Sequence, residues 1–145
     1  MPGTPDLPQT ILAFDFGLRR IGVALGQDVT GSASPLGVVG NQETGVDHDA
    51  IAALIREWNP TRLVVGLPAH MDGSTSDMEA PVRAFIAELE RYGLPIDTVD
   101  ERYTSVEAER VLKDARAAGS RGRISKAEID SAAAVFIAER YLASL

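Results

Sequence analysis

The sequence predicts an α/β fold with one mixed, five-stranded sheet, whose three N-terminal strands are antiparallel and whose two faces are covered by helices. Two observations predict this class. Apolar residues near the N-terminus recur with the period of two that is typical of strands. From residue 47 onward, segments with helical spacing alternate with short apolar runs.

Three strands are expected at the start of the chain, over residues 10–17, 20–29 and 33–41. The first is a nearly continuous apolar run, and the second alternates large apolar residues with small ones. Gly17 suits a short hairpin turn between them. Pro35 and Gly37 place the third strand toward an edge of the sheet.

The remaining elements follow in alternation. Helices are expected within residues 47–60, 81–92, 104–118 and 125–145, and strands over residues 62–66 and 95–101. Pro81 suits the first turn of its helix, where a missing N–H costs least. Thr104 and Ser125 each precede a glutamate by three residues, which is the capping-box pattern of a helix start.

The chain is expected to form a single domain over residues 10–145 after a short flexible lead at residues 1–9. Hydrophobic residues make up 45% of the chain, which is enough for a substantial core. The absence of cysteine excludes disulfides, thiolate zinc sites and cysteine nucleophiles. No apolar run has the length of a membrane span and no secretion signal is visible, so a cytoplasmic protein is expected.

Charge is distributed unevenly along the chain. The net charge of −7 argues against tight, extensive binding of a nucleic-acid duplex. Residues 102–126, however, hold seven basic and three acidic residues, a local net charge of +4. The basic residues are Arg102, Arg110, Lys113, Arg116, Arg121, Arg123 and Lys126. This segment is either a solvated helix and loop or a surface that binds phosphates.

Three carboxylates occupy positions where charge is costly. Asp15 interrupts an apolar strand, Glu101 ends the strand 95–101, and Asp130 lies one turn into the last helix, on its apolar stripe. Each acid also has a separate structural explanation. Asp15 could form an ion pair with Arg19 or Arg20. Glu101 could pair with Arg102 or stabilise a helix N-terminus, and Asp130 could cap a neighbouring loop.

A shared divalent cation would explain the three acids together, because it removes the repulsion between clustered carboxylates. All-oxygen ligation indicates Mg²⁺ or Mn²⁺. Zinc is disfavoured, since the chain has two histidines and no cysteine. His48 and His70 are expected at the surface, where His70, in the glycine-rich loop, could approach a substrate. Carboxylates that hold such ions suit the hydrolysis of phosphodiester bonds.

Several motifs resemble the YqgF/RuvX family of bacterial Holliday junction resolvases. They are "DFGLRRIGVAL", "GLPAHMDGS" followed by "VRAFIAEL", "DERYTSVEAERVL" and "KAEIDSAAAVFIAERYL", and the resemblance covers residues 11–142. It implies an RNase H-like fold. Its acidic catalytic and metal-binding positions fall on Asp15, Glu101 and Asp130. His70 stands where the family usually has asparagine, a departure in the Gly-Pro loop.

The resemblance also implies a metal-dependent endonuclease that matures the 5′ end of pre-16S rRNA or cleaves four-way DNA junctions. Symmetric cleavage of a junction requires a homodimer, whereas trimming of RNA does not. Arg20, Arg102 and Thr104 match polar positions of the family. The residues expected to contact nucleic acid are Arg19, Arg20, Arg102, Thr104, Arg121, Arg123 and Lys126.

Two rival functions stay open. Sugar kinases and actin-like ATPases begin with a similar motif, but they need two such domains, and 145 residues supply one. Alternatively, the domain is a non-catalytic module that binds nucleic acid, or the ribosome or transcription machinery, with a vestigial acid cluster.

Overall fold

The computed structural model describes residues 9–42, 45–67, 79–100 and 126–145. They form one six-stranded mixed sheet in the order β4-β3-β2-β1-β5-β6. The strands are β1 (Thr10–Asp15), β2 (Arg20–Gln27), β3 (Ser32–Gln42), β4 (Gly45–Val46), β5 (Arg62–Leu67) and β6 (Ile96–Asp100). The helices are α1 (His48–Trp58), α2 (Glu79–Leu89), the short 3₁₀ helix η2 (Glu90–Tyr92) and α4 (Lys126–Ala143).

The expected class is confirmed, but the expected number of strands is wrong. The first three strands are antiparallel, whereas β1, β5 and β6 run parallel to one another. The additional strand is β4, which pairs with Asn41 and Gln42 at the end of β3. Two residues are too few to show a period in the sequence, so only the pairing reveals this strand.

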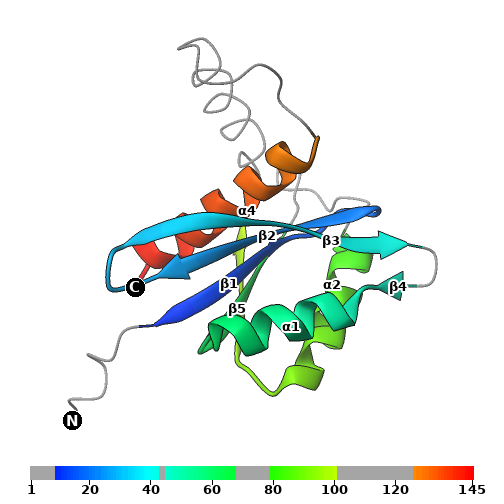
Figure 1. The fold of residues 1–145 in the computed structure, drawn as a ribbon, viewed down its shortest axis with the longest axis horizontal. Coiled ribbons are helices and arrows are strands. Elements are labelled where there is room, and N and C mark those ends of the chain that lie inside the picture. The colour runs from blue at the N-terminus through cyan, green and yellow to red at the C-terminus, as the bar shows by residue number, and fades with distance from the viewer. Residues whose placement is uncertain (1–8, 43–44, 68–78, 101–125) are drawn as a thin grey trace.

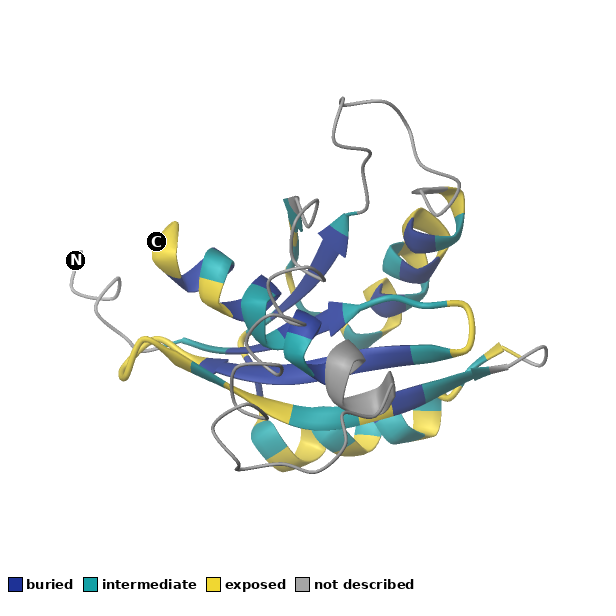
Figure 2. Ribbon diagram, turned by 90° about the horizontal axis from the view of Figure 1, so that it is seen from above, coloured by how far each residue is buried: buried dark blue, intermediate teal, exposed yellow. Residues whose placement is uncertain are grey.

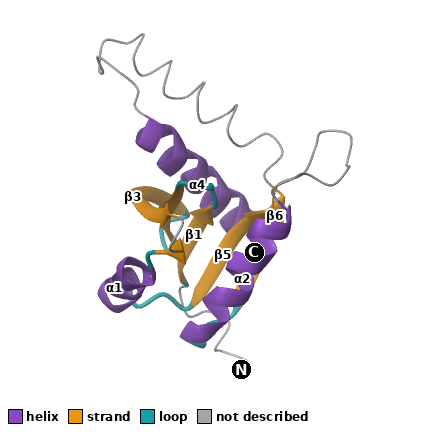
Figure 3. Cartoon of the chain, turned by 90° about the vertical axis from the view of Figure 1, so that its right-hand side faces the viewer, coloured by secondary structure: helices purple, strands orange, loops and turns teal. Residues whose placement is uncertain are grey.

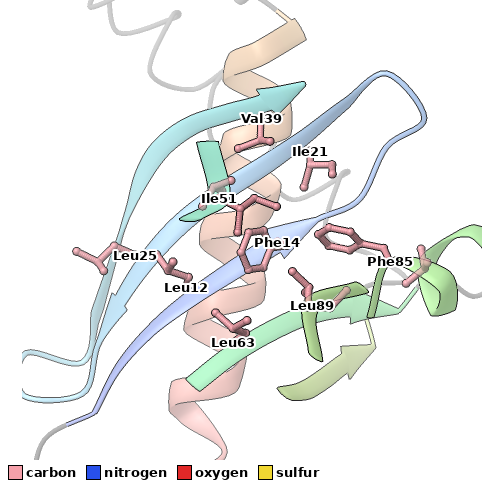
Figure 4. Close-up of a cluster of buried hydrophobic side chains, with 12 residues drawn as sticks. Leu12, Phe14, Ile21, Leu25, Val39, Ile51, Leu63, Phe85 and Leu89 are labelled. Atoms are coloured by element: carbon pink, nitrogen blue, oxygen red, sulfur yellow. The ribbon is translucent and has the colours of Figure 1, made fainter. Parts of the chain in front are cut away.

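Helices cover both faces of the sheet. Figure 1 shows α4 on one face and α1 and α2 on the other. On β1, Leu12 and Phe14 pack in the cluster beneath α1 and α2, which Figure 4 shows, while Ile11 and Ala13 pack against α4. The central strands are buried, as the dark blue ribbon of Figure 2 shows. In Figure 3, α1 and α4 lie on opposite sides of these strands.

Local signals set the ends of the helices. The Asp47 side chain accepts a 3.1 Å hydrogen bond from the backbone N–H of Ala50 and caps α1 at its start. Asn59 ends α1 in the left-handed conformation with φ of 47°. Pro81 lies in the first turn of α2, as predicted. Gly93 adopts φ of 71° directly after η2.

The last helix is confirmed as an amphipathic element. Ala133, Ala134, Ile137 and Tyr141 are all buried, as their spacing predicts. The expected helix over 104–118 and the residue Ser125 lie outside the described part of the chain. None of the helices in the described ranges is long and apolar enough to cross a membrane.

His48, which was expected at the surface, is only partly exposed. Its side chain is 18% exposed. Its Nδ1 is 2.7 Å from the Tyr92 hydroxyl and its Nε2 is 2.6 Å from Oε1 of Glu88. The histidine therefore connects the start of α1 to the end of α2 and to η2. The two partners lie 40 and 44 residues away in the chain, so local sequence does not reveal these contacts. His70 lies outside the described residues.

Candidate active site

Asp15 is the last residue of β1, at the edge of the sheet where the parallel strands end. It is half-buried and pairs with Gly22 of β2. Because β1, β5 and β6 are parallel, their carboxyl ends meet at this edge. β6 ends there at Asp100, the residue before Glu101 in the chain.

Strand alternation assigns Asp15 to the α4 face of the sheet. Ile11 and Ala13 pack against α4, and Asp15 continues the same series of alternate residues. The neighbours Phe14 and Phe16 pack into the opposite core, where their rings contact Phe85. The two aromatics that flank Asp15 in sequence therefore pack on the face of the sheet opposite to its carboxylate.

Glycines adjoin Asp15 on both sides in the sheet. Gly22 is its partner in β2. Gly66 of β5 follows Val65, which pairs with Phe14, so it stands level with Asp15 in the parallel register. Neither glycine has a side chain, so the positions directly opposite Asp15 in β2 and β5 carry no side chain.

Arg20 starts β2 and shares the face of Asp15. It is two residues before Gly22 and four before Ala24, so alternation places it on the α4 side. It is half-buried, and both Asp15 and Arg20 make polar interactions. Opposite Arg20 lies Gly40 of β3, where an added Cβ would have no heavy atom within 4 Å. Among the described residues, no side chain therefore stands directly opposite Arg20 in β3.

The start of α4 lies across this part of the sheet. The buried Ser131 hydroxyl is 3.5 Å from the carbonyl oxygen of Val23, to which it donates, and it accepts a 3.3 Å hydrogen bond from the N–H of Gly37. Val23 pairs with Phe14, the residue before Asp15. Ser131 thus fixes α4 to the sheet at Val23, whose partner in β1 is the residue next to Asp15.

The remaining predicted site residues lie only partly within the described part of the chain. Asp130 precedes Ser131 in α4, and Lys126 is the first residue of that helix, but their side chains are outside the description. Arg19 is exposed in the turn between β1 and β2. The others lie outside the described residues, namely Glu101, Arg102, Thr104, Arg121 and Arg123.

The structure therefore brings Asp15 and Arg20 together with the helix that carries Asp130. Over the described ranges, no three His, Cys, Asp or Glu side chains form a group that could hold a metal ion. One residue beside the site was missed from the sequence. Asn41 donates a 2.7 Å hydrogen bond from Nδ2 to the carbonyl oxygen of Gly17. No local pattern marks Asn41, because its partner lies 24 residues away in the chain.

Comparisons with known proteins agree on one family. The family model described as "RuvX: Holliday junction resolvase" matches residues 9–144. A protein of Burkholderia multivorans named "Putative pre-16S rRNA nuclease" is 43% identical over 146 residues, covering 100% of this chain and 96% of its own length. A protein of Chromobacterium violaceum with the same name is 48% identical over 124 residues, covering 85% of this chain and 89% of its own.

Solved structures agree on the fold. RuvC of T. thermophilus, in complex with a Holliday junction substrate, aligns with a TM-score of 0.59 at 13% identity, covering 94% of each chain. The Fowlpox virus resolvase with Holliday junction DNA aligns with a TM-score of 0.56 at 11% identity, covering 93% of this chain and 97% of its own. The expected RNase H-like fold is therefore confirmed.

Proposed function

Because this chain belongs to the RuvX family and is a nuclease, we propose that it is a divalent-metal-dependent endonuclease acting on structured RNA, with a pre-16S rRNA precursor as its substrate. One observation carries the proposal. Asp15 ends β1 on the α4 face between two glycines, beside Arg20 and beneath the helix that carries Asp130. An acid so placed can take part in a metal site that binds a phosphodiester.

The proposed metal ligands are Asp15, Glu101 and Asp130. The observed place of Asp15 suits a metal ligand, because it lies at the carboxyl end of β1, where the parallel strands β1, β5 and β6 end together. Three carboxylates form an all-oxygen donor set, which suits Mg²⁺ or Mn²⁺. When bound, such an ion would stabilise the charge that develops on the phosphate in hydrolysis.

Cationic residues are proposed to hold the nucleic acid. Arg19, exposed in the turn that follows Asp15, and Arg20, which shares the face of Asp15, would bind phosphates on one side of the site. The other proposed contacts are Arg102, Thr104, Arg121, Arg123 and Lys126. The net charge of −7 argues against tight, extensive binding of a duplex, so an RNA or branched substrate that is held locally by residues 102–126 is favoured.

Cleavage of a four-way DNA junction is the second candidate, favoured by the description of the matching family model. Two symmetric cuts need two copies of the site related by a two-fold axis, and hence a homodimer. Sedimentation of the protein alone and with a junction would test this: a monomer in both samples contradicts the junction as substrate. We further propose that residues 10–145 are a single cytoplasmic nuclease domain after the lead 1–9.

The decisive experiment compares cleavage of pre-16S RNA, unstructured RNA and a four-way DNA junction with Mg²⁺, with Mn²⁺ and with EDTA. The parent should cut with metal and lose activity in EDTA. Asp15→Asn, Glu101→Gln and Asp130→Asn should each cut at least about a hundredfold more slowly. Asp28→Asn is the matched control, because Asp28 is exposed in the turn between β2 and β3 at the opposite end of the sheet.

Two results would contradict the proposal. If Asp15→Asn cuts as fast as the parent, the activity belongs to another site or to a contaminant. If the parent binds RNA but cuts none of the substrates with either metal, the non-catalytic binding module is the better description.

A further inference from the structure

The loop formed by residues 16–19 follows Asp15 directly and exposes a large apolar side chain. Leu18 is 64% exposed. Within the described ranges, three other large apolar side chains are exposed: Val29, Val38 and Leu145. Single exposed apolar residues are common on protein surfaces and by themselves indicate no function. What distinguishes Leu18 is the support of its loop and its two cationic neighbours, Arg19 and Arg20.

Three contacts hold this loop in place. The ring of Phe16 packs against Phe85 with centroids 5.2 Å apart. Asn41 donates from Nδ2 to the carbonyl oxygen of Gly17 over 2.7 Å, and its backbone N–H donates to the carbonyl oxygen of Arg19 over 3.0 Å. The residues on both sides of Leu18 are therefore anchored, while Leu18 itself points outward from the anchored backbone.

Gly17 makes the turn tight. A Cβ at this position would lie 2.5 Å from the carbonyl oxygen of Arg20, so only glycine fits without moving the backbone. A loop that is already ordered loses little conformational entropy when it binds a partner. The anchored Leu18 is therefore suited to a contact that needs a defined position beside Asp15.

The chemistry around Leu18 matches a nucleotide. An apolar side chain can pack on the flat face of a base, and the adjacent Arg19 and Arg20 can bind the flanking phosphates. In a duplex the faces of the bases are stacked on one another and only their edges are accessible. A contact with a base face therefore selects a nucleotide that is unstacked, in a single strand or at a branch point.

We propose that Leu18 packs against an unstacked nucleobase next to the phosphodiester held at Asp15, and that Asn41 positions it by anchoring the loop. This inference rests on the proposed nuclease function and adds a residue that selects single-stranded substrate. The contact makes Leu18 a determinant of binding, and it takes no part in the chemical step.

The test measures binding in an Asp15→Asn background, so that cleavage does not enter. Fluorescence anisotropy compares a labelled single-stranded RNA with a duplex of the same sequence, and the matching DNA strands form a second arm. Leu18→Ala should weaken single-strand binding about four- to tenfold, since each methylene buried in a contact contributes about fourfold in affinity. Duplex binding should change less than about twofold, because a stacked duplex offers no base face.

Val29→Ala is the matched control. Val29 is 73% exposed in the turn between β2 and β3, at the end of the sheet opposite Asp15, and its truncation should leave both affinities unchanged. A Leu18→Ala variant that binds single strands as tightly as its parent overturns the base contact, whatever the cleavage assay shows. A parent that binds neither strand overturns the proposed function and the base contact together.

Asn41→Ala tests the positioning role, because it removes the hydrogen bond to Gly17 and retains Leu18. Single-strand affinity should fall, and adding Leu18→Ala should cost little more, since both changes remove the same contact. Fully additive losses, or a loss of affinity only at temperatures where the variant unfolds, would contradict the positioning role.

Discussion

Replacing Gly26 by alanine should loosen the packing of α4 on the sheet. An added Cβ at Gly26 would lie 2.8 Å from Cγ1 of Ile11 and 3.4 Å from Cβ of Ala138. Ordinary contact begins at 3.4 Å, so Ile11 would have to retreat by about 0.6 Å. Ile11 is fully buried between the sheet and α4, and it has no free space to enter.

The magnitude follows from two opposed effects. Overpacking a core costs about 1–3 kcal/mol of unfolding free energy. Replacing glycine by alanine also restricts the unfolded chain, which stabilises the fold by about 0.4–1 kcal/mol. Gly40→Ala isolates the second effect, because a Cβ at Gly40 meets no heavy atom within 4 Å. The two variants should therefore differ by about 1–3 kcal/mol, with Gly26→Ala the less stable.

Urea denaturation followed by circular dichroism measures this difference, with the parent and both variants at one protein concentration. In thermal unfolding, the same difference should separate the two midpoints by about 2–4 °C per kcal/mol for a chain of this size. Equal stability of the two variants would refute the reasoning. It would mean that α4 does not pack against β2 at Gly26, contrary to the structure.

Three further outcomes are expected. Phe85→Ala should lower the free energy of unfolding by about 3–5 kcal/mol, since it removes a buried ring that contacts two other aromatics; a loss below about 1 kcal/mol in urea denaturation would contradict this core. Gly17→Ala should slow cleavage by about a hundredfold, because its Cβ would displace the Arg20 carbonyl 2.5 Å away and with it the loop beside Asp15; wild-type rates would count against the tight turn. Burial and a hydrogen bond to Asp97 raise the pKa of Tyr141 above its ordinary value of 10.0, so its contribution to stability is complete below that pH and is lost as the pH rises toward the folded pKa. Tyr141→Phe should therefore lose less stability than the parent between about pH 9 and 11 in urea titrations, and identical pH profiles would be evidence against this linkage.

Much of the fold was predictable because its signals are local. The period of two in β1 and β2, the helical spacing in α1 and α4, and the turn residues Pro81 and Gly93 each depend on neighbours a few residues away. Such local signals predict where a helix or strand lies in the chain, but they do not predict which other elements pack against it. The two-residue strand β4 was missed for the same reason: it exists only through its pairing with β3.

The candidate site was predictable in part. Asp15 could be identified from the sequence because an acid in an apolar strand demands an explanation. The glycines at its sides could not, since Gly66 reaches it only through the parallel pairing of β1 with β5. Asn41 and its hydrogen bond to Gly17 depend on the return of β3 beside β2. The contacts of His48 could not be predicted either, because Glu88 and Tyr92 reach it from α2 and η2.

The sequence by itself determined the order of strands and helices, the apolar stripe of the last helix and the unusual position of Asp15. Each of these follows from periodicity or from the cost of charge among apolar neighbours. Only the tertiary structure decided that Asp15 shares its face with Arg20 and with the start of α4, and that residues 16–19 are anchored with Leu18 exposed. These features join residues far apart in the chain, and long-range pairing of strands, not local preference, brings such residues together.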